Sequence, residues 1–483
     1  MLGAVLLLAL LSGCAVGPNY HPPKTSAAAQ WASPLAGGET NTPADVAAWW
    51  KNFEDTNLDR LLAMAVESNL TLHIAEARIR EARAQRGVVA ADFGPNIDAS
   101  GSYSRNRFSK NEFPAFPPGT ALDYDQYQAG FDAAWELDVF GGTRRAIQAA
   151  NADIAAAELG RDDVLRSLLA EVARDYIAAR AFQQRLAITR ENIEAQSRIV
   201  NLTRDRFHAG LTSDLDVQQA EALLATTESD VPTLETGFQN TAYQLDVLLA
   251  QPSGTLSAEL SSAAPVPGSP PQVPVGLPSD LLRRRPDVRQ AERELAAASA
   301  QIGVAKAGLF PRFSLTGSAD LISVSASDWW DASSRFWSAG PSVVWPIFQS
   351  GRIRAHIRVQ NAREEQALNE YQQVILTAFQ DVNSALTAYA KEQIRRQSLA
   401  KSVQANQRAV KLAASLYRQG LTDFLGVLTS QAQLYQSQDA LVQSDQFVAL
   451  NLVALYKALG GGWEWGKTNS TTLSMATFPP KER

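Results

Sequence analysis

The feature that most constrains the fold is a helix-to-strand transition that occurs twice in the chain. Residues 90–102 read AADFGPNIDASGS and residues 306–318 read KAGLFPRFSLTGS, and an alanine-rich helical pattern leads into each segment. After Pro95 and after Pro311 the residues alternate between polar and apolar, which is typical of a strand with one apolar face. Repetition at a long, fixed period indicates one duplicated architecture rather than unrelated domains.

The longest helical patterns run from about Thr143 to His208 and from about Arg352 to Arg418, and neither contains a proline. At about 1.5 Å per residue, each helix would be on the order of 100 Å long. The first keeps the spacing of a coiled-coil seam, with apolar residues at Leu165, Leu169, Val172, Tyr176, Ala179 and Leu186. Helices of this length are rarely explained by a compact globule.

Each long helix is expected to end at a glycine, Gly210 or Gly420, because glycine suits a helix C-terminus. A residue such as Thr212, Ser213 or Asp214 can then cap a return helix. The return helices are expected to reach about Leu249 and Leu459.

The repeat and the composition divide the chain into segments. These are a signal peptide over 1–13, a tether over 14–45, a first repeat over 46–251, a proline-rich linker over 252–280, a second repeat over 281–462 and a tail over 463–483. We expect strands at about 96–108, 124–140, 312–325 and 336–348, and helices over 57–91 and 286–308. Trp49 and Trp50 are expected to pack on a neighbouring helix.

The predicted strands have the length that a tilted strand needs to cross the hydrocarbon core of a membrane. Their apolar faces carry the aromatic residues of an expected membrane girdle, namely Trp135, Phe131, Phe313, Trp337 and Trp345. Open sheet edges are not tolerated in lipid, so spanning strands would require several chains to share one barrel. Barrels of eight, twelve or sixteen strands all remain open, and the alternative is a soluble sheet packed on helices.

The first residues indicate export and lipidation. Leu2 to Leu11 form an apolar run that is too short to span a bilayer, and it ends at Leu-Ser-Gly-Cys14, which resembles a bacterial lipobox. The resemblance implies cleavage before Cys14 and attachment of a diacylglycerol to its sulfur. Ala15 follows the cysteine, where lipoproteins of the inner membrane typically carry aspartate, and this favours the outer membrane. The alternative is a buried, unmodified cysteine.

Composition argues against several other functions. The net charge of −6 gives no reason to expect a nucleic acid partner, and the four histidines are scattered without a pair at metal-ligand spacing. No phosphate-binding loop or nucleophile elbow is present in the sequence. The arginines at 283–285 are interpreted as a solvated or ion-paired helix start rather than an anion site. We therefore expect no enzyme activity, no metal and no cofactor beyond the lipid.

Several ordered motifs together resemble the outer membrane efflux lipoproteins, the TolC/OprM-like outer membrane factors, of the NodT type. The motifs are the lipobox, Trp49-Trp50, Arg284-Arg285-Pro286-Asp287-Val288, the two proline junctions and the two Gly-Leu turns. The resemblance implies a mainly α fold with a membrane β-barrel portion. In that family, three chains share one twelve-stranded barrel, which continues as an α-helical barrel of about 100 Å through the periplasm.

The resemblance also implies passive conduction. An inner-membrane pump, usually of the resistance-nodulation-division type, and a periplasmic adaptor would deliver drugs or other small molecules to the duct. Protein secretion by a type I system and metal-ion export are alternatives within transport. A coiled-coil lipoprotein that tethers envelope layers is an alternative of another class, but it would not account for the four alternating strands.

Site residues follow from the same resemblance. The adaptor-docking turns would be Ala209, Gly210, Leu211 and Thr212 in the first repeat, and Gln419, Gly420, Leu421 and Thr422 in the second. Leu425 would supply the hydrophobic ring of the aperture. Thr429 stands where relatives carry aspartate, so that the nearby carboxylates of Asp423, Asp214 and Asp216 are the candidates for an acidic ring. Helix capping is the alternative role of Asp214 and Asp423.

Overall fold

The computed structural model describes residues 15–24, 30–32, 39–40, 42, 46–109, 121–268, 270 and 273–465. The chain divides into two compact units. Unit 1 comprises residues 1–24, 78–157 and 291–371, and unit 2 comprises residues 25–77, 158–290 and 372–483. The predicted lipidation residue, Cys14, lies outside the described residues.

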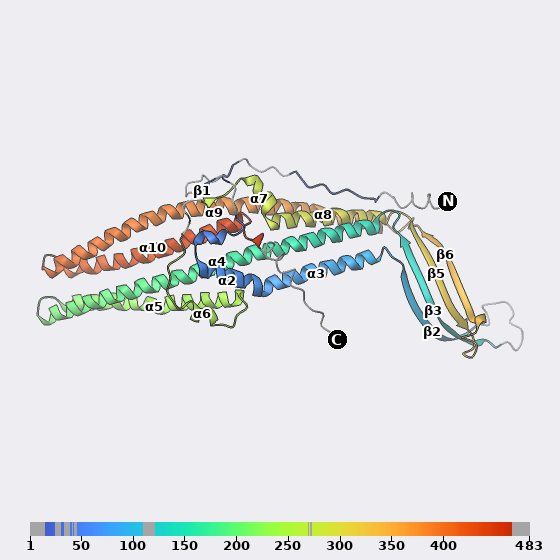
Figure 1. The fold of residues 1–483 in the computed structure, drawn as a ribbon, viewed down its shortest axis with the longest axis horizontal. Helices are drawn as coiled ribbons and strands as arrows, with labels where there is room; N and C mark the ends of the chain where they lie inside the picture. Colours follow the sequence, from blue (N-terminus) through green and yellow to red (C-terminus); the bar gives the residue numbers. More distant parts are fainter. Residues whose placement is uncertain are drawn as a thin grey trace. The chain divides into compact units, whose positions relative to one another are not determined.

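Unit 1 contains one antiparallel sheet of four strands in the order β2-β3-β5-β6 (Figure 1). The strands are β2 (Asn96–Arg107), β3 (Asp123–Leu137), β5 (Arg312–Ser323) and β6 (Arg335–Val344). Two neighbours in this sheet, β3 and β5, come from different copies of the repeat, so the sheet joins the two halves of the chain. The outer strands, β2 and β6, each have one edge without a partner strand in the described part of the chain.

The register places the apolar positions of all four strands on one face. Phe131 lies opposite Ala99 on one side and opposite Ala319 on the other, and Ala319 in turn lies opposite Trp337. Because side chains alternate between faces along a strand, odd-numbered residues share one face across the whole sheet. The alternation seen in the sequence therefore becomes one mainly apolar and one mainly polar face, with Phe336 and Val344 of β6 among the exceptions on the second.

Each predicted strand extended past the observed C-terminal end, by one to four residues. After β3, the carboxylate of Asp138 accepts hydrogen bonds from the N–H groups of Thr143 (3.1 Å) and Arg144 (3.0 Å). These contacts turn the chain out of the sheet and cap the following helix. After β6, Pro346 has no N–H to donate to a neighbouring strand.

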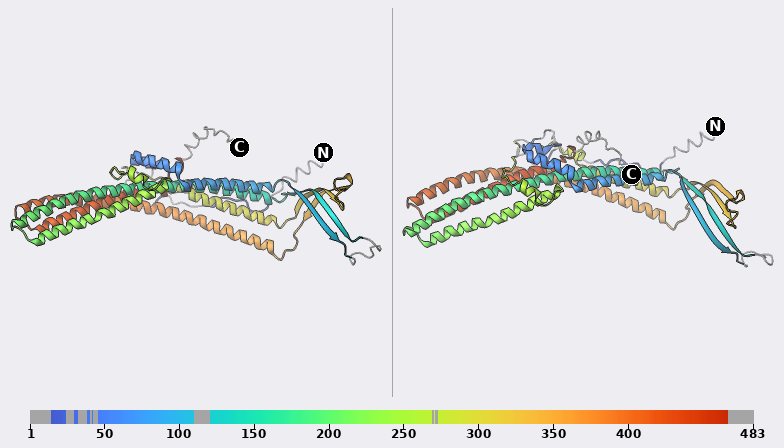
Figure 2. Two further views of the ribbon diagram at one scale, coloured as in Figure 1. Left: turned by 90° about the horizontal axis from the view of Figure 1, so that it is seen from below. Right: turned by 60° about the horizontal axis from the view of Figure 1, so that its bottom comes forward.

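The helices keep the predicted lengths almost throughout. Those that contribute to both units are α3 (Leu70–Ala91), α4 (Gly142–His208), α8 (Pro286–Ala307) and α9 (Arg352–Arg418). In unit 2 they are joined by η1 (Trp49–Phe53), α2 (Thr56–Ser68), α5 (Asp214–Leu248), α6 (Thr255–Glu259), α7 (Pro278–Arg284) and α10 (Phe424–Ala458). Within unit 2, α5 runs back along α4 from the turn at Gly210 (Figures 1 and 2). Among the described residues, no helix has both the length and the apolarity to cross a membrane.

The prediction of one helix over 57–91 was wrong. Asn69 interrupts it with an extended backbone (φ −64°, ψ 123°). Its buried side chain accepts a hydrogen bond from the N–H of Leu72 (3.0 Å) and donates one to the carbonyl of Leu248 (2.8 Å). The asparagine thus ends α2, caps α3 and ties both helices to the end of α5.

The predicted tether and linker are tied to each other in unit 2. The short strand β1 (Glu39–Thr40) of the tether pairs in parallel with β4 (Val273–Pro274) of the linker. The indole of Trp31 also donates to the carbonyl of Gly276 (3.0 Å). The sequence did not predict these contacts, because they join segments that are more than two hundred residues apart.

The tryptophan pair packs as predicted. Trp49 and Trp50 are each 1% exposed, and the Trp49 ring stacks on Tyr456 of α10 with centroids 5.5 Å apart. Gly461 and Gly462 follow α10 and approach Trp49 so closely that an added methyl group would crowd its ring. The glycines at the end of the second repeat therefore allow the close packing of this segment on Trp49.

The Arg-Pro-Asp motif supports an ion-pair network at the end of α10. Arg285 is buried, pairs with Asp287 (2.6 Å) and Asp381 (3.0 Å), and donates to the carbonyl of Ala458 (3.3 Å). Arg166 pairs with Asp287 as well (3.4 Å) and donates to the carbonyl of Lys457 (2.7 Å). For Arg285, the expectation of an ion-paired helix start is confirmed.

Electrostatics within this network favour the ionised forms. Burial alone would raise the pKa of the Asp287 carboxyl, but the Arg285 hydrogen bond and the charges of Arg166 and Arg285 outweigh it, and the pKa lies below its ordinary value. Two arginines also satisfy the last carbonyl groups of α10, which have no partner within the helix.

We predict that Arg285→Met destabilises the protein by about 3–5 kcal/mol, because Asp287 and Asp381 lose their buried partner. Chemical denaturation of the detergent-solubilised protein measures this loss. Arg190→Met is the matched control, since Arg190 forms an exposed pair with Glu235 and should cost about 1 kcal/mol or less. Equal costs for both variants would contradict a central role for the motif.

Candidate functional site

Four of the aromatic residues predicted for the girdle, Phe131, Trp135, Phe313 and Trp337, share the apolar face of the sheet, and Trp345 directly follows β6. Phe131 and Trp337 are 61% and 77% exposed, Trp135 and Trp345 are exposed to a lesser degree, and Phe313 is half-buried. Phe313 is more covered than the others because Leu137 and Val343 lie opposite it on both sides. Large aromatic side chains on an exposed sheet face are unusual for a surface in water and typical of one that meets lipid.

Two tryptophans occupy equivalent places in the two repeats. The indole N–H of Trp135 donates to the carbonyl of Phe93 (2.9 Å), and that of Trp345 donates to the carbonyl of Leu309 (3.2 Å). Phe93 and Leu309 align with each other in the repeated transition segment. Each indole N–H therefore satisfies a carbonyl at a helix-to-strand junction, and both rings remain exposed.

The opposite face of the sheet is polar. Asp98 and Asp132 lie opposite each other, and Ser318 and Ser338 continue the same row across β5 and β6. Asp320 is largely buried, and a methyl group at Gly130, directly opposite, would collide with its carboxylate. On the polar face, Gly130 therefore leaves the space that the carboxylate of Asp320 occupies.

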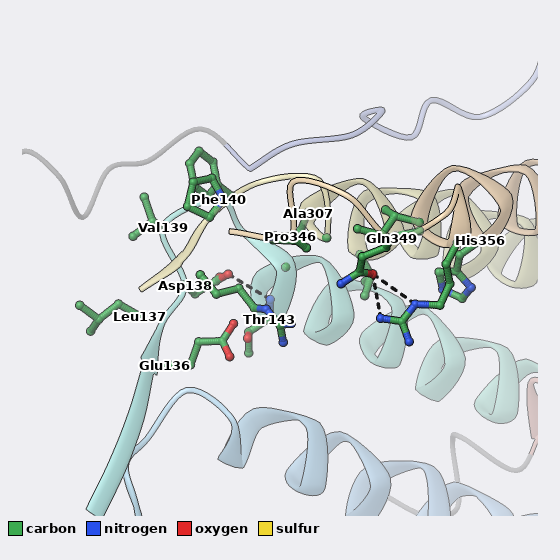
Figure 3. Close-up of a pocket in the computed structure, with 18 residues that line it drawn as sticks. Glu136, Leu137, Asp138, Val139, Phe140, Thr143, Ala307, Pro346, Gln349 and His356 are labelled. Atoms are coloured by element: carbon green, nitrogen blue, oxygen red, sulfur yellow. Dashed lines mark hydrogen bonds between the residues drawn. The ribbon is translucent and has the colours of Figure 1, made fainter. Parts of the chain in front are cut away.

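A cavity of about 560 Å³, lined by polar and apolar side chains, lies in unit 1 where the sheet meets its helices (Figure 3). The end of β3 and the starts of α4 and α9 line it, and Gln349 there accepts hydrogen bonds from the guanidinium of Arg352 (2.7 Å). His356 and Glu136 also line the cavity. In the part of the chain that the structure describes, no cluster of three metal-ligating side chains occurs.

The two predicted docking turns have the same backbone geometry. Gly210 (φ 69°) and Gly420 (φ 74°) adopt the left-handed conformation. The N–H groups of Leu211 and Leu421 then close each turn on the carbonyls of Arg206 (2.8 Å) and Leu416 (2.9 Å). This is the Schellman closure, in which a glycine ends a helix. The prediction that these glycines stop the helices is confirmed.

Most side chains at the turns are open to solvent. Leu211, Leu421, Ala209 and Gln419 are exposed, whereas Thr212 and Thr422 are half-buried. Exposed leucines at two equivalent turns form a small apolar surface on each hairpin end. Such a surface is suited to contact with another protein.

The predicted aperture carboxylates have different tasks. Asp423 is the N-cap of α10 and accepts from the N–H of Gly426 (3.2 Å), which confirms its capping role. Asp216 accepts from the hydroxyl of Thr212 and from the N–H of Ser213 (3.4 Å). Ser213, and not Asp214, is the N-cap of α5. Asp214 is exposed, with a long hydrogen bond from Gln218 (3.5 Å).

Leu425 and Thr429 lie one helical turn apart on α10. Leu425 is 55% exposed, and the Thr429 hydroxyl donates to the carbonyl of Leu425 (2.8 Å). The two side chains therefore share one face of the helix, which another copy of the chain could contact. Within one chain they do not enclose a pore.

The sequence did not indicate the contact that joins the two hairpins near these turns. The guanidinium of Arg206, on α4, lies 4.5 Å from the ring centroid of Tyr417, on α9, and Nη1 donates to the Tyr417 carbonyl (3.4 Å). The Tyr417 ring also contacts Phe424, and both rings belong to a buried cluster with Val200 and Val427. The position of Arg206 in the last turn of a long helix suggested that it could bind carbonyl groups there. The sequence could not show that its partner is Tyr417, about two hundred residues later.

Comparison with known proteins identifies the architecture. The family model described as outer membrane efflux protein matches residues 61–251 and 277–461. Nodulation protein T of Rhizobium leguminosarum bv. viciae is 33% identical over 97% of this chain and 95% of its own length. The toluene efflux pump outer membrane protein TtgC of Pseudomonas putida is 33% identical over 98% of this chain and 97% of its own.

Solved structures agree with these relatives. The outer-membrane channel OprN matches with a TM-score of 0.86 and 36% identity over 93% of this chain and 100% of its own. The open state of the MtrE outer membrane channel of Neisseria gonorrhoeae matches with a TM-score of 0.80 and 27% identity over 94% of this chain and 99% of its own. The fold is that of TolC-like outer membrane channels, mainly α-helical with a four-stranded sheet in each chain.

We predict that Arg206→Met weakens the joint between the hairpins by about 1 kcal/mol, because it removes a cation–π contact and a hydrogen bond. Hydrogen exchange at residues 413–428 should then be about fivefold faster. Arg204→Met is the matched control, since Arg204 pairs with Glu221 of its own hairpin (2.7 Å). Unchanged exchange in Arg206→Met would show that the apolar cluster alone holds the joint.

Proposed function

The chain belongs to the outer membrane efflux protein family and is an outer membrane channel of an efflux system, and we propose that three copies together form the conducting duct. The observation that carries the proposal is the sheet, which has an exposed aromatic face and two unpaired edges in the described chain. Three copies of four strands would give twelve strands and pair every edge. The aromatic face would then meet lipid, and the polar face would line the lumen.

In this arrangement the duct conducts passively. Serines and carboxylates on the polar face, such as Ser318 and Asp132, would keep the lumen hydrated, and the wide interior would make few specific contacts with a passing molecule. Two of the relatives export toluene and pyoverdine according to their names. We propose small organic molecules as the transported class for this chain, with the choice among them made by the pump.

We propose that the hairpin ends bind a periplasmic adaptor, which links the duct to an inner-membrane pump of the resistance-nodulation-division type. The exposed Leu211 and Leu421, at equivalent closed turns, support this assignment. Relatives named as outer membrane proteins of efflux pumps imply such partners. Lipidation at Cys14 would add an anchor in the outer membrane.

We also propose that Leu425 narrows the aperture. Its exposed side chain lies outside the buried cluster at the hairpin ends, although Val427 and Phe424 on the same helix belong to that cluster. In a trimer, three copies of Leu425 could meet around the axis. Of the three carboxylates considered for an acidic ring, Asp214 does not hold a helix terminus, and it is the candidate that we retain.

The trimer predicts the mass of the particle. Light scattering of the detergent-solubilised, unheated protein, corrected for bound detergent, should give three times the mass of one processed chain. A dimer or tetramer would replace the twelve-stranded barrel with one of eight or sixteen strands, and a monomer would contradict a shared barrel altogether.

For the aperture, Leu425→Ser should increase single-channel conductance in planar bilayers at least about twofold, because a ring of leucines would become smaller and polar. Leu421→Ser is the matched control, since Leu421 is exposed at the turn but belongs to the proposed docking surface. Conductance that rises equally in both variants, or in neither, would remove Leu425 from the aperture.

A further inference from the structure

The residues that follow Cys14 lie in a binding site formed by α4 and α8 of unit 1. Arg145, at the start of α4, is only 5% exposed, and its guanidinium reaches this segment rather than a carboxylate. Nε donates to the carbonyl of Val16 (3.1 Å), and Nη2 donates to the carbonyl of Gly17 (3.3 Å) and the side chain of Asn19 (2.9 Å). A buried arginine thus uses most of its donors to hold one short segment.

Glycines permit the close approach. Gly17 has φ 101°, and a methyl group there would collide with Cα of Gly303 on α8. A methyl group at Gly303 would lie 2.7 Å from Cγ of Arg145 and 2.9 Å from the carbonyl of Val16. At Gly141 it would lie 2.6 Å from Cβ of Ala15. Residues 15–17 therefore pack closely against α4 and α8 at three glycines, Gly17, Gly141 and Gly303.

Hydrogen bonds at both ends extend the fit. The N–H of Val16 donates to the carbonyl of Phe140 (3.1 Å), and the hydroxyl of Tyr20 donates to the carboxylate of Glu292 (2.6 Å). Burial, and then the bond to Glu292, raise the pKa of the Tyr20 hydroxyl above its ordinary value. The segment is consequently held at Val16, Gly17, Asn19 and Tyr20, whereas its composition predicts only an extended tether.

The site lies at the helix-to-strand junction. The ring of Phe140 stacks on that of Phe310 with centroids 4.6 Å apart, and both residues belong to segments that connect a strand and a helix. The indole of Trp345 is anchored at the junction of α8 and β5 through Leu309, and that of Trp135 at the junction of α3 and β2 through Phe93. Ala15 lies against Gly141. Cys14 immediately precedes Ala15 in the sequence, and consecutive Cα atoms are about 3.8 Å apart.

We propose that Arg145, Gly303 and Gly141 form a docking site that fixes the depth of the lipid anchor, so that acyl chains on Cys14 enter the bilayer beside Phe140 at the level of Trp135 and Trp345. The inference rests on the lipidation proposed above. A free tether would let the anchor reach the membrane from many positions. A docked one holds the anchor and the aromatic residues at the same level, so that they act together on the depth of the channel.

A photo-cross-linking experiment on the full-length lipoprotein tests this assignment. Benzoylphenylalanine is placed at Phe140 or, as the matched position, at Phe131, which lies on the apolar face about 20 Å along the strand from its end. In vesicles of phosphatidylethanolamine and phosphatidylglycerol, irradiation should join position 140, but not 131, to the lipopeptide that begins at Cys14. Mass spectrometry of the digested protein identifies the product.

Variants of the site supply the second comparison. Arg145→Met, and Gly17→Ala in the segment itself, should lower the yield of the cross-link at position 140 at least about tenfold, because charged hydrogen bonds and the close fit are lost. Arg144→Met is the control, since the neighbouring Arg144 pairs with Asp138 (3.1 Å) instead of the segment. Gly17→Ala changes only the docked segment, so its result holds even if Arg145→Met fails to fold.

Two results would overturn the proposal. One is an equal yield at positions 131 and 140 in the parent protein, and the other is a yield at 140 that neither Arg145→Met nor Gly17→Ala lowers. A mature protein whose mass lacks the lipid would overturn it too. Conductance and particle mass are measured separately, so a failure here leaves the proposed duct standing or falling on its own tests.

Discussion

Unpaired backbone groups at the edges of the four-stranded sheet set the main constraint on this molecule. In hydrocarbon, an N–H or carbonyl group without a partner costs several kcal/mol, and β2 and β6 each present such an edge in the described chain. Trp337, close to one of these edges, is strongly exposed. A single chain is therefore incomplete as a membrane protein, and the proposed trimer is the arrangement that completes it.

Polar contacts at the helix ends determine the position of the exposed leucines at the two hairpin ends. Asp423 and Asp216 hold the first turns of α10 and α5, and Gly210 and Gly420 close the last turns of α4 and α9. These local bonds leave Leu211, Leu421 and Leu425 exposed. Carboxylates near a turn can be interpreted from the sequence as an acidic ring around a pore. Of Asp214, Asp216 and Asp423, however, the last two stabilise helix termini.

Three arginines make long-range connections in the two units; Arg285 and Arg145 are buried, and Arg206 is half-buried. Arg285 joins the start of α8 to the end of α10, Arg206 joins the two hairpins, and Arg145 holds the N-terminal segment. Each guanidinium donates to a backbone carbonyl of a segment that is more than one hundred residues away in the sequence. Because such a contact requires the correct fold of distant segments, it makes the units cooperative rather than a series of independent hairpins.

The sequence by itself determined the duplication, because the same motifs recur in both halves of the chain. It also determined the bounds of the long helices, the strands with their apolar faces and the glycine stops, because each of these depends on residues within a few positions of one another. It missed the break at Asn69, which depends on the carbonyl of Leu248, and the docking of residues 15–20 by Arg145. Only the tertiary structure decided these contacts, together with the role of Arg206. The partners of Asn69, Arg145 and Arg206 lie far away in the sequence, and local periodicity carries no information about such distant partners.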